Sequence, residues 1–222
     1  MQDKKNFYIN GQWVSPIEPR SFEVINPATE EPCAEISLGG KKDVDAAVTS
    51  AKKAFETWGF TTKEERLNLF EKLYDIYKKN WDQMAKTISL EMGAPIDFST
   101  ELQTKTGASH IKSFKNILKN FKFEKTLDEE KNQTILYEPK GVCALITPWN
   151  WPINQVNLKV IPALASACTV VLKPSEIAPL SSMLLAEMID EVKFPAGVFN
   201  LVNGDGAVTG DALTSHPDVD MI

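Results

Sequence analysis

Beyond Gly141, short apolar runs alternate with segments that have the spacing of amphipathic helices. The apolar runs read VCALIT, TVVL, VFNLV and VDMI, and the helix-like segments cover residues 154–167, 180–192 and 207–214. Strands that alternate with helices in this way predict a parallel sheet with right-handed crossovers. Pro162 lies inside the first of these helices, where its ring is expected to kink the helix.

The first forty residues have a different pattern, in which short alternating segments are separated by turn residues. Asn10 and Gly11 form the pair that most favours a tight β-hairpin, and alternation continues on both sides of Asn26. This part of the chain is therefore predicted to be a β arm. Between Asp43 and Trp58 the apolar period changes to that of a helix.

Two longer helices are predicted after this first one. Thr62, with Glu65 three positions later, forms a capping box that starts a helix extending to the Gly-Ala-Pro segment at 93–95. Ser99 is expected to cap the next helix, whose apolar face continues to Phe121. Both patterns are typical of amphipathic helices packed on a core.

Residues 122–140 alternate polar and apolar positions around the charged sequence DEEKNQ. This pattern predicts a two-stranded ribbon with a charged tip. An isolated hairpin is marginal in water, so the ribbon is expected to join a sheet elsewhere or another subunit.

Composition and net charge indicate which classes of molecule the chain is expected to bind. The chain has 222 residues, of which 43% are hydrophobic and 24% charged, and its formal net charge is −6. An acidic chain without a clustered basic stripe argues against a nucleic-acid partner, and small molecules are the expected ligands. No apolar run approaches the roughly 20 residues that span a bilayer, and the opening residues lack the apolar segment of a signal peptide, which predicts a cytoplasmic protein without a membrane partner.

Ligands of an open parallel sheet bind outside the carboxyl ends of its strands, so the residues after each predicted strand are the candidates for a site. Three turns follow the strands: 148–151 (PWNW), 173–176 (KPSE) and 203–210 (NGDGAVTG). The topology predicts that all three meet at one edge of the sheet.

Two of these turns have features of a nucleotide site. Gly206 and Gly210 open a helix, where free backbone N–H groups and the helix dipole favour a phosphate, although glycines after a strand are more often plain turn formers. Lys173 and Glu176 suit phosphate or hydroxyl oxygens and vicinal ribose hydroxyls, respectively. The alternative for this charged pair is a solvated surface ion pair, worth about 0–1 kcal/mol.

The PWNW turn raises a separate possibility. Pro148, Trp149 and Pro152 are expected to stiffen the strand end and exclude water, which would leave the Asn150 carboxamide as a fixed donor in a dry site. One such donor to an anionic oxygen contributes about 2.7–4 kcal/mol in acyl-transfer enzymes. The equally weighted alternative is that Asn150 caps the following helix.

The four segments LITPWNWP, VVLKPSEIAP, FPAGVFNLVNGDG and HPDVDMI, in this order and spacing, resemble the aldehyde dehydrogenase superfamily. The resemblance extends to YINGQWV, INPATEE and EMGAP, and so covers the whole chain. It implies an α/β fold with a Rossmann-like parallel sheet, incomplete in this chain, together with N-terminal helices and a protruding β-hairpin. It also implies oxidation of an aldehyde to an acid by NAD(P)+ through a cysteine thiohemiacetal.

The resemblance assigns roles to individual residues. Asn150 corresponds to the oxyanion-stabilising asparagine, and Lys173 and Glu176 to residues that bind the adenosine ribose. Glu176 favours NAD+ over NADP+, because a carboxylate repels a 2′-phosphate, although the neighbouring lysine can offset this. The remaining candidate cofactor-binding residues are Ile146, Thr147, Pro148, Trp149, Ser175, Gly206, Ala207 and Gly210.

The resemblance also divides the chain into parts. Residues 1–121 correspond to the N-terminal arm and the helical part of the cofactor-binding domain, and residues 141–222 to half of its Rossmann-like sheet. Residues 122–140 resemble the family's oligomerisation hairpin, which implies homodimers or homotetramers.

The family's nucleophilic cysteine and general-base glutamate correspond to positions beyond the DVDMI motif, where this chain ends. Cys143 and Cys168 lie in or beside strands expected to be buried, and Glu30 and Glu31 precede Cys33, where they would raise its pKa. All three are therefore interpreted as reduced and structural. His110 and His216 have no evident catalytic partner, and no G-x-S-x-G turn is present.

We therefore interpret the sequence as an N-terminal fragment of an NAD(P)+-dependent aldehyde dehydrogenase, inactive on its own. A CoA-acylating semialdehyde dehydrogenase fragment is an alternative within the family. A non-catalytic dinucleotide-binding or self-associating protein is an alternative from another class. The sequence does not identify the aldehyde, although Phe98, Leu102 and His110 are candidates for part of the substrate wall.

Overall fold

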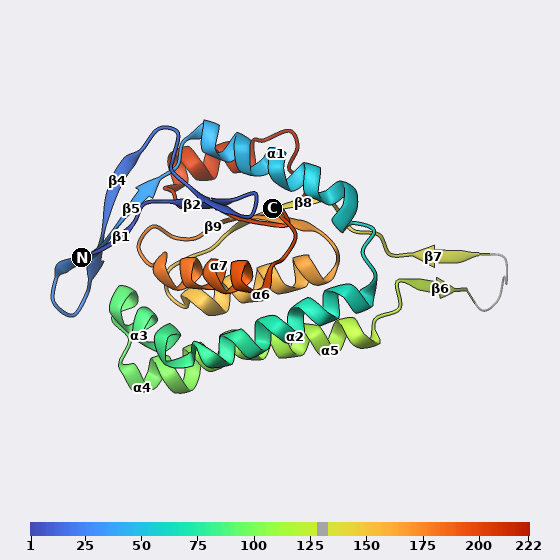
Figure 1. The fold of residues 1–222 in the computed structure, drawn as a ribbon, viewed down its shortest axis with the longest axis horizontal. Coiled ribbons are helices and arrows are strands. Elements are labelled where there is room, and N and C mark those ends of the chain that lie inside the picture. Colours follow the sequence, from blue (N-terminus) through green and yellow to red (C-terminus); the bar gives the residue numbers. More distant parts are fainter. Residues whose placement is uncertain (128–132) are drawn as a thin grey trace.

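The computed structural model describes residues 1–127 and 133–222, and shows an α/β fold built around one main sheet (Figure 1). The strands are β1 (Gln2–Lys4), β2 (Phe7–Ile9), β3 (Gln12–Val14), β4 (Arg20–Asn26), β5 (Glu31–Leu38), β6 (Glu124–Thr126), β7 (Thr134–Leu136), β8 (Val142–Ile146), β9 (Thr169–Lys173) and β10 (Phe199–Leu201). The helices are α1 (Lys41–Trp58), α2 (Lys63–Lys79), α3 (Trp81–Met92), α4 (Ile96–Phe98), α5 (Lys105–Asn120), α6 (Pro152–Ala165), α7 (Leu180–Val192) and α8 (Asp211–Thr214). Two π-helical segments, η1 (Ser99–Thr104) and η2 (Gly206–Gly210), complete the elements.

The main sheet has the strand order β3-β2-β10-β9-β8. Strands β8, β9 and β10 are parallel, as the alternation of strands and helices predicts. The predicted fourth strand, VDMI, is reduced in the structure to a parallel bridge between Met221 and Cys143. The hairpin of β2 and β3, which the sequence places in a separate arm, extends the main sheet because β2 pairs antiparallel with β10.

Helices cover both faces of the main sheet (Figure 1). Helix α1 packs on one face over Val142, Ala144 and Val171, whereas α6 and α7 cover the face that carries Val170 and Leu172. Successive strand residues point to opposite faces, so these fully apolar runs serve two cores at once. Helices α2 and α5 form an outer layer beyond α6.

The hairpin of β6 and β7 projects from the body of the molecule (Figure 1). Its strands pair with each other in antiparallel register from Glu124–Leu136 to Thr126–Thr134. The predicted ribbon is thus confirmed, and within the described part of the chain these strands join no larger sheet. Residues 128–132 of the predicted charged tip lie outside the described residues.

Predicted turn chemistry is confirmed at two places. Asn10 and Gly11 both have positive φ, 54° and 74°, as a two-residue hairpin turn requires. The Thr62 hydroxyl accepts a hydrogen bond from Glu65 N while the Glu65 carboxylate accepts one from Thr62 N, so the capping box forms as expected.

Three helix predictions need correction. The helix expected from Thr62 to residue 93 is broken at Asn80, whose side-chain amide donates to Ile76 O at 2.9 Å and so competes with the helical hydrogen bonds. Ser99 does not cap the next helix: it has helical φ and ψ, and α4 already begins at Ile96. Helix α6 ends at Ala165 rather than residue 167, because Ala167 adopts φ of 63°.

Within the residues that the structure describes, no helix combines the length and the apolar character needed to cross a membrane.

The outer helices approach closely at Gly107 in α5. A Cβ added there would lie 2.4 Å from the Tyr77 hydroxyl and 3.1 Å from Ile153. The same hydroxyl donates to Thr104 O at 3.0 Å in a fully buried position. Glycine at this position therefore allows α5 to lie against both α2 and α6.

We expect Gly107→Ala to lower the free energy of unfolding by about 1–3 kcal/mol, because the added methyl group overpacks this contact. Gly206→Ala is the matched control, since no heavy atom lies within 4 Å of a Cβ added at Gly206. Chemical denaturation of the two variants checks the prediction, and equal stabilities would contradict it.

Candidate functional site

The carboxyl ends of β8, β9 and β10 lie at one edge of the main sheet, and each leads into one of the three predicted turns. Thr147 N donates to Lys173 O at 3.2 Å, which joins the first turn to the second. Lys173 Nζ donates to Gly204 O at 2.6 Å, which joins the second to the third. The predicted convergence of the three turns is therefore confirmed.

Lys173 is part of the interior of this edge. Its side chain is only 4% exposed, and its ammonium group donates to Pro174 O as well as to Gly204 O. Glu176 Oε2 lies 3.6 Å from Lys173 Nζ, and the Glu176 side chain is 27% exposed. The alternative of a solvated surface ion pair is therefore wrong, because the cation is buried.

Electrostatics at Lys173 reflect this burial. Burial lowers the pKa of Lys173, while the carboxylates of Glu176 and Asp205 act in the opposite direction. A buried ammonium needs such compensation, since an unpaired charge is costly in a region of low dielectric constant. Of Lys173 and Glu176, only Glu176 has a side chain with substantial solvent exposure, so its carboxylate oxygens can accept hydrogen bonds from hydroxyl groups.

Ser175 has a structural position within the same turn. Its side chain is nearly buried, and its hydroxyl oxygen accepts a hydrogen bond from Ile177 N at 3.3 Å. This local bond closes the turn between Lys173 and Glu176 in the manner of a serine turn.

In the glycine turn, Asp205 caps η2. Its Oδ1 accepts from Val208 N at 2.7 Å, and its backbone oxygen accepts from Gly210 N at 3.0 Å. These two amides are therefore bonded to Asp205 rather than free for a phosphate, which differs from the expectation for this helix start. Gly206 and Ala207 are exposed, and the space beside Gly206 is open.

The glycine turn is held in a specific conformation from two sides. A Cβ at Gly204 would lie 1.8 Å from Thr209 Oγ1, so only glycine fits beside this buried hydroxyl. Thr209 Oγ1 donates to Gly39 O, and Gly39 N donates to Asn203 O at 2.8 Å. Gly39 follows β5 and was not among the predicted site residues, because nothing in the local sequence indicates this long-range contact.

Asn150 lies in an exposed turn. Trp149 is 49% exposed, and Pro148 and Asn150 are exposed as well, so the expected exclusion of water is wrong for the described residues. The capping alternative is also wrong, because the N-cap of α6 is Trp151 and makes no side-chain capping bond. The Asn150 carboxamide has no protein partner among the described residues and is free to donate to a ligand.

Two of the candidate wall residues lie close to this turn. Phe98 makes an edge-to-face contact with Trp151, with ring centroids 5.4 Å apart. His110 Nε2 lies 2.7 Å from Asn154 Oδ1 in the first turn of α6. Leu102, the third candidate, is 48% exposed. Helices α4 and α5 therefore flank the PWNW turn.

The cysteines lie away from this edge. Cys143 and Cys168 are buried near the amino ends of β8 and β9, whereas Lys173 lies at the carboxyl end of β9. A hydrogen bond between the two thiols lowers the pKa of Cys168 and raises that of Cys143. The burial and position of both thiols separate them from the Asn150 turn.

Cys33 is half-buried and has a raised pKa, as expected, but for a different reason. Burial is the main cause, and the nearby carboxylate of Glu91 adds to it, rather than Glu30 and Glu31. The described residues contain no group of three or more His, Cys, Asp or Glu side chains suited to hold a metal ion.

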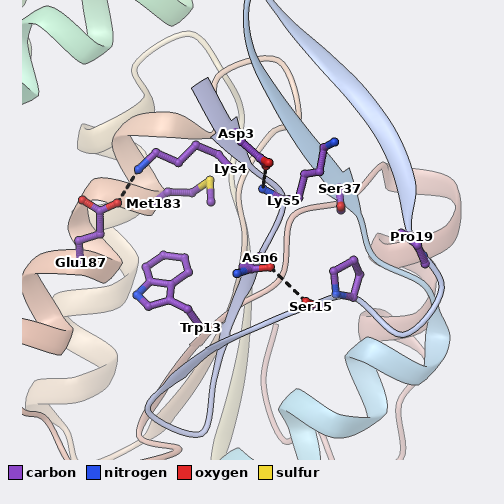
Figure 2. Close-up of a pocket in the computed structure, with 11 residues that line it drawn as sticks. Asp3, Lys4, Lys5, Asn6, Trp13, Ser15, Pro19, Ser37, Met183 and Glu187 are labelled. Atoms are coloured by element: carbon purple, nitrogen blue, oxygen red, sulfur yellow. Dashed lines mark hydrogen bonds and ion pairs between the residues drawn. The ribbon is translucent and has the colours of Figure 1, made fainter. Parts of the chain in front are cut away.

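A separate cavity lies near the N-terminus (Figure 2). It has a volume of about 710 Å³ between the β arm and α7, and no predicted site residue lines it. Its two lysines are already paired, Lys4 with Glu187 at 2.7 Å and Lys5 with Glu35 at 2.8 Å. The convergent turns, not this cavity, therefore bring the candidate chemistry together.

Glu91 is another residue that was not predicted from the sequence, and it fixes the helix start that follows the KPSE turn. It is fully buried at the end of α3, and its carboxylate accepts hydrogen bonds from Leu180 N and Ser181 N at the start of α7. Helix α7 has no capping side chain of its own, since Pro179 occupies the N-cap position. Glu91 therefore anchors the end of the segment that carries Ser175 and Glu176.

Comparison with known proteins agrees with this arrangement. The sequence model described as the aldehyde dehydrogenase family matches residues 13–222. The chain belongs to the aldehyde dehydrogenase family. This aldehyde dehydrogenase chain is 50% identical over its whole length to 3-succinoylsemialdehyde-pyridine dehydrogenase from a Pseudomonas species, of which it covers 46%.

Solved structures of the family have the same fold. An aldehyde dehydrogenase from Bartonella henselae is 56% identical with a TM-score of 0.98, and the match covers all of this chain and 47% of that one. An aldehyde dehydrogenase C mutant from Pseudomonas syringae, in complex with NAD+ and octanal, is 44% identical with a TM-score of 0.95, and the match covers 98% of this chain and 44% of that one. The chain thus spans less than half of the length of these relatives.

The buried Glu91 makes a prediction for stability. Burial raises the pKa of Glu91 from 4.5 to about 7, although the hydrogen bonds from Ser181 and Leu180 act to lower it. Between these two values the folded protein retains a proton that the unfolded chain has released. The free energy of unfolding therefore falls by about 3 kcal/mol as pH rises from about 4.5 to 7.

We expect Glu91→Gln to remove this pH-dependent contribution, whereas Glu101→Gln, which alters an exposed carboxylate on η1, retains it. Urea denaturation of the three proteins across this pH range measures the difference. An unchanged pH dependence in Glu91→Gln would refute the assignment.

Proposed function

We propose that this chain is the amino-terminal, cofactor-binding portion of an NAD+-dependent aldehyde dehydrogenase that oxidises an aldehyde to a carboxylic acid. The observation that carries the proposal is the meeting of the PWNW, KPSE and NGDG turns at one edge of a parallel sheet. Family membership supports the reaction, and the NAD+ and octanal bound by the Pseudomonas syringae relative support the ligand classes.

The proposed division of labour follows the three parts of the chain. Residues 1–121 supply the arm and helical part of the cofactor-binding domain, and residues 141–222 supply half of its sheet. Residues 122–140 form the hairpin for assembly of a homodimer or homotetramer. Exposed apolar side chains of the hairpin, at Ile135, Leu136 and Tyr137, support this role.

The residues at the sheet edge fit the adenosine end of a dinucleotide. Glu176 presents carboxylate oxygens to ribose hydroxyls, and the open backbone at Gly206 and Ala207 leaves room for an adenine ring. Thr147 Oγ1, at the start of the first turn, is buried and has no hydrogen-bond partner among the described residues. When bound, NAD+ supplies the acceptor for the hydride removed from the substrate.

Cofactor choice follows from the charges at this edge. The Glu176 carboxylate disfavours a 2′-phosphate, and the neighbouring cation does not fully offset this because Lys173 donates to two backbone oxygens. We therefore propose NAD+ as the preferred cofactor, with NADP+ as the weaker one.

Asn150 is the proposed catalytic residue of this part of the enzyme. Its side-chain amide donates to the oxygen of the hemithioacetal and so stabilises the negative charge that develops there. The thiolate that forms this adduct comes from outside the chain, because Cys143 and Cys168 are buried at the other edge of the sheet. The 222 residues alone are therefore proposed to be inactive, and the complete enzyme to act in the cytoplasm.

The test compares this chain with the polypeptide extended through the following reading frame. We expect no NADH formation by the 222-residue protein with NAD+ and a panel of aldehydes, and turnover by the extended protein. Absorbance at the NADH band reports both reactions. Turnover by the short chain would overturn the proposal that its nucleophile is external.

In the extended protein, we expect Asn150→Ala to lower kcat by about 10²–10³-fold, because one preorganised donor to the oxyanion is lost. The KM for NAD+ is expected to change little. Asn120→Ala is the control, since the Asn120 amide bonds to Asn116 O near the exposed end of α5. Steady-state kinetics with a saturating aldehyde make the comparison, and full activity in Asn150→Ala would rule out the assigned role.

A further inference from the structure

A contact between the β arm and the glycine turn involves Arg20, a residue that neither the sequence motifs nor the family comparison assigns. Arg20 lies at the start of β4, far from the parallel strands in sequence. Its Nη1 donates to Asp205 Oδ2 at 2.7 Å, and its Nη2 donates to Gly39 O at 3.0 Å. One guanidinium group thus bonds both the turn and the end of β5.

Asp205 is fixed by partners on both of its carboxylate oxygens. Arg20 bonds Oδ2, while Val208 N bonds Oδ1 and so starts η2. Partial burial acts to raise the pKa of Asp205, but the hydrogen bonds from Arg20 and Val208 outweigh it and hold this pKa below its ordinary value. A charge-assisted bond of this kind is directional, so the orientation of Arg20 restrains that of Asp205.

The same turn leads directly to the ribose-binding pair. Gly204, next to Asp205, accepts the hydrogen bond from Lys173, which in turn lies beside Glu176. Polar contacts and the peptide bond between Gly204 and Asp205 therefore link Arg20 to the pair of Lys173 and Glu176. Arg20 belongs to the arm, and Glu176 belongs to the proposed cofactor site.

We propose that Arg20 is a positioning residue for the cofactor, which sets the conformation of the Asp205–Gly210 turn through its bonds to Asp205 and Gly39. The inference rests on the proposed function and deepens it, because it makes the β arm part of the NAD+ site. Arg20 does not contact the reacting atoms. Its effect is therefore confined to cofactor affinity.

The Arg20 side chain is 41% exposed and therefore partly buried, so the melting temperature of each variant is measured to separate a positioning role from a general role in stability. The residue can also be replaced conservatively: a lysine at position 20 can bond Asp205 but lacks the second nitrogen that reaches Gly39.

The experiment uses the full-length protein that contains this chain, with NAD+ as the probe. We expect Arg20→Gln to raise the Kd for NAD+, measured by isothermal titration calorimetry, about three- to tenfold, in the range seen for residues within coupled networks. The KM for NAD+ rises in parallel, while kcat and the melting temperature stay at wild-type values. Arg20→Lys restores part of the affinity.

Two further variants test the route of the effect. Asp205→Asn is expected to weaken NAD+ binding to a similar extent, and Arg20→Gln adds little in the double variant because both changes break the same contact. Lys52→Gln is the matched control: Lys52 pairs with Asp218 on the surface, between α1 and the turn after α8, and its loss leaves the Kd unchanged.

An unchanged Kd in Arg20→Gln overturns the inference, as does a loss of affinity that accompanies a lower melting temperature and is not relieved in Arg20→Lys. These results differ from failure of the proposed function. In that case the unmodified full-length protein would itself neither bind NAD+ nor oxidise an aldehyde.

Discussion

The parallel pairing of β8, β9 and β10 is the constraint on which the rest of the structure depends. Parallel strands have their carboxyl ends at the same edge, so turns that are distant in sequence are brought within hydrogen-bonding range of one another. Lys173 converts this proximity into a fixed geometry, because its ammonium group bonds the backbone of the next turn. The buried cation in turn requires compensating carboxylates, and Glu176 and Asp205 provide them.

Much of this arrangement is encoded locally and was predictable. The apolar runs and helical periods place the parallel strands, the Asn10–Gly11 turn and the hairpin of β6 and β7, because each depends on neighbouring residues alone. The convergence of the three turns follows from topology once the strands are known to be parallel. The break at Asn80 was missed because a side-chain hydrogen bond causes it, and apolar spacing does not reveal such a bond. The start of α4 was missed because the backbone is already helical before Ser99.

The unpredicted parts of the site all involve contacts between residues remote in sequence. Glu91 caps a helix that begins far along the chain, and Gly39 and Arg20 bond the glycine turn from the arm. No local pattern signals such pairings, since each partner has an ordinary alternative as a surface charge or a turn residue. The solvent exposure of the Asn150 turn was missed for a related reason. Exclusion of water from a turn depends on which other segments pack over it, and the local sequence of prolines and tryptophans does not specify those segments.

The antiparallel pairing of β2 with β10 has a consequence for biosynthesis. Tyr8 and Leu201 are partners in one sheet although they are far apart in sequence. On the ribosome, the hairpin that contains Tyr8 emerges long before β10 and has no β10 partner until Leu201 has been translated. Contacts of such high sequence separation form slowly, so the newly made hairpin keeps an unpaired strand edge until β10 appears. An exposed edge of this kind is a condition under which chaperones bind nascent chains.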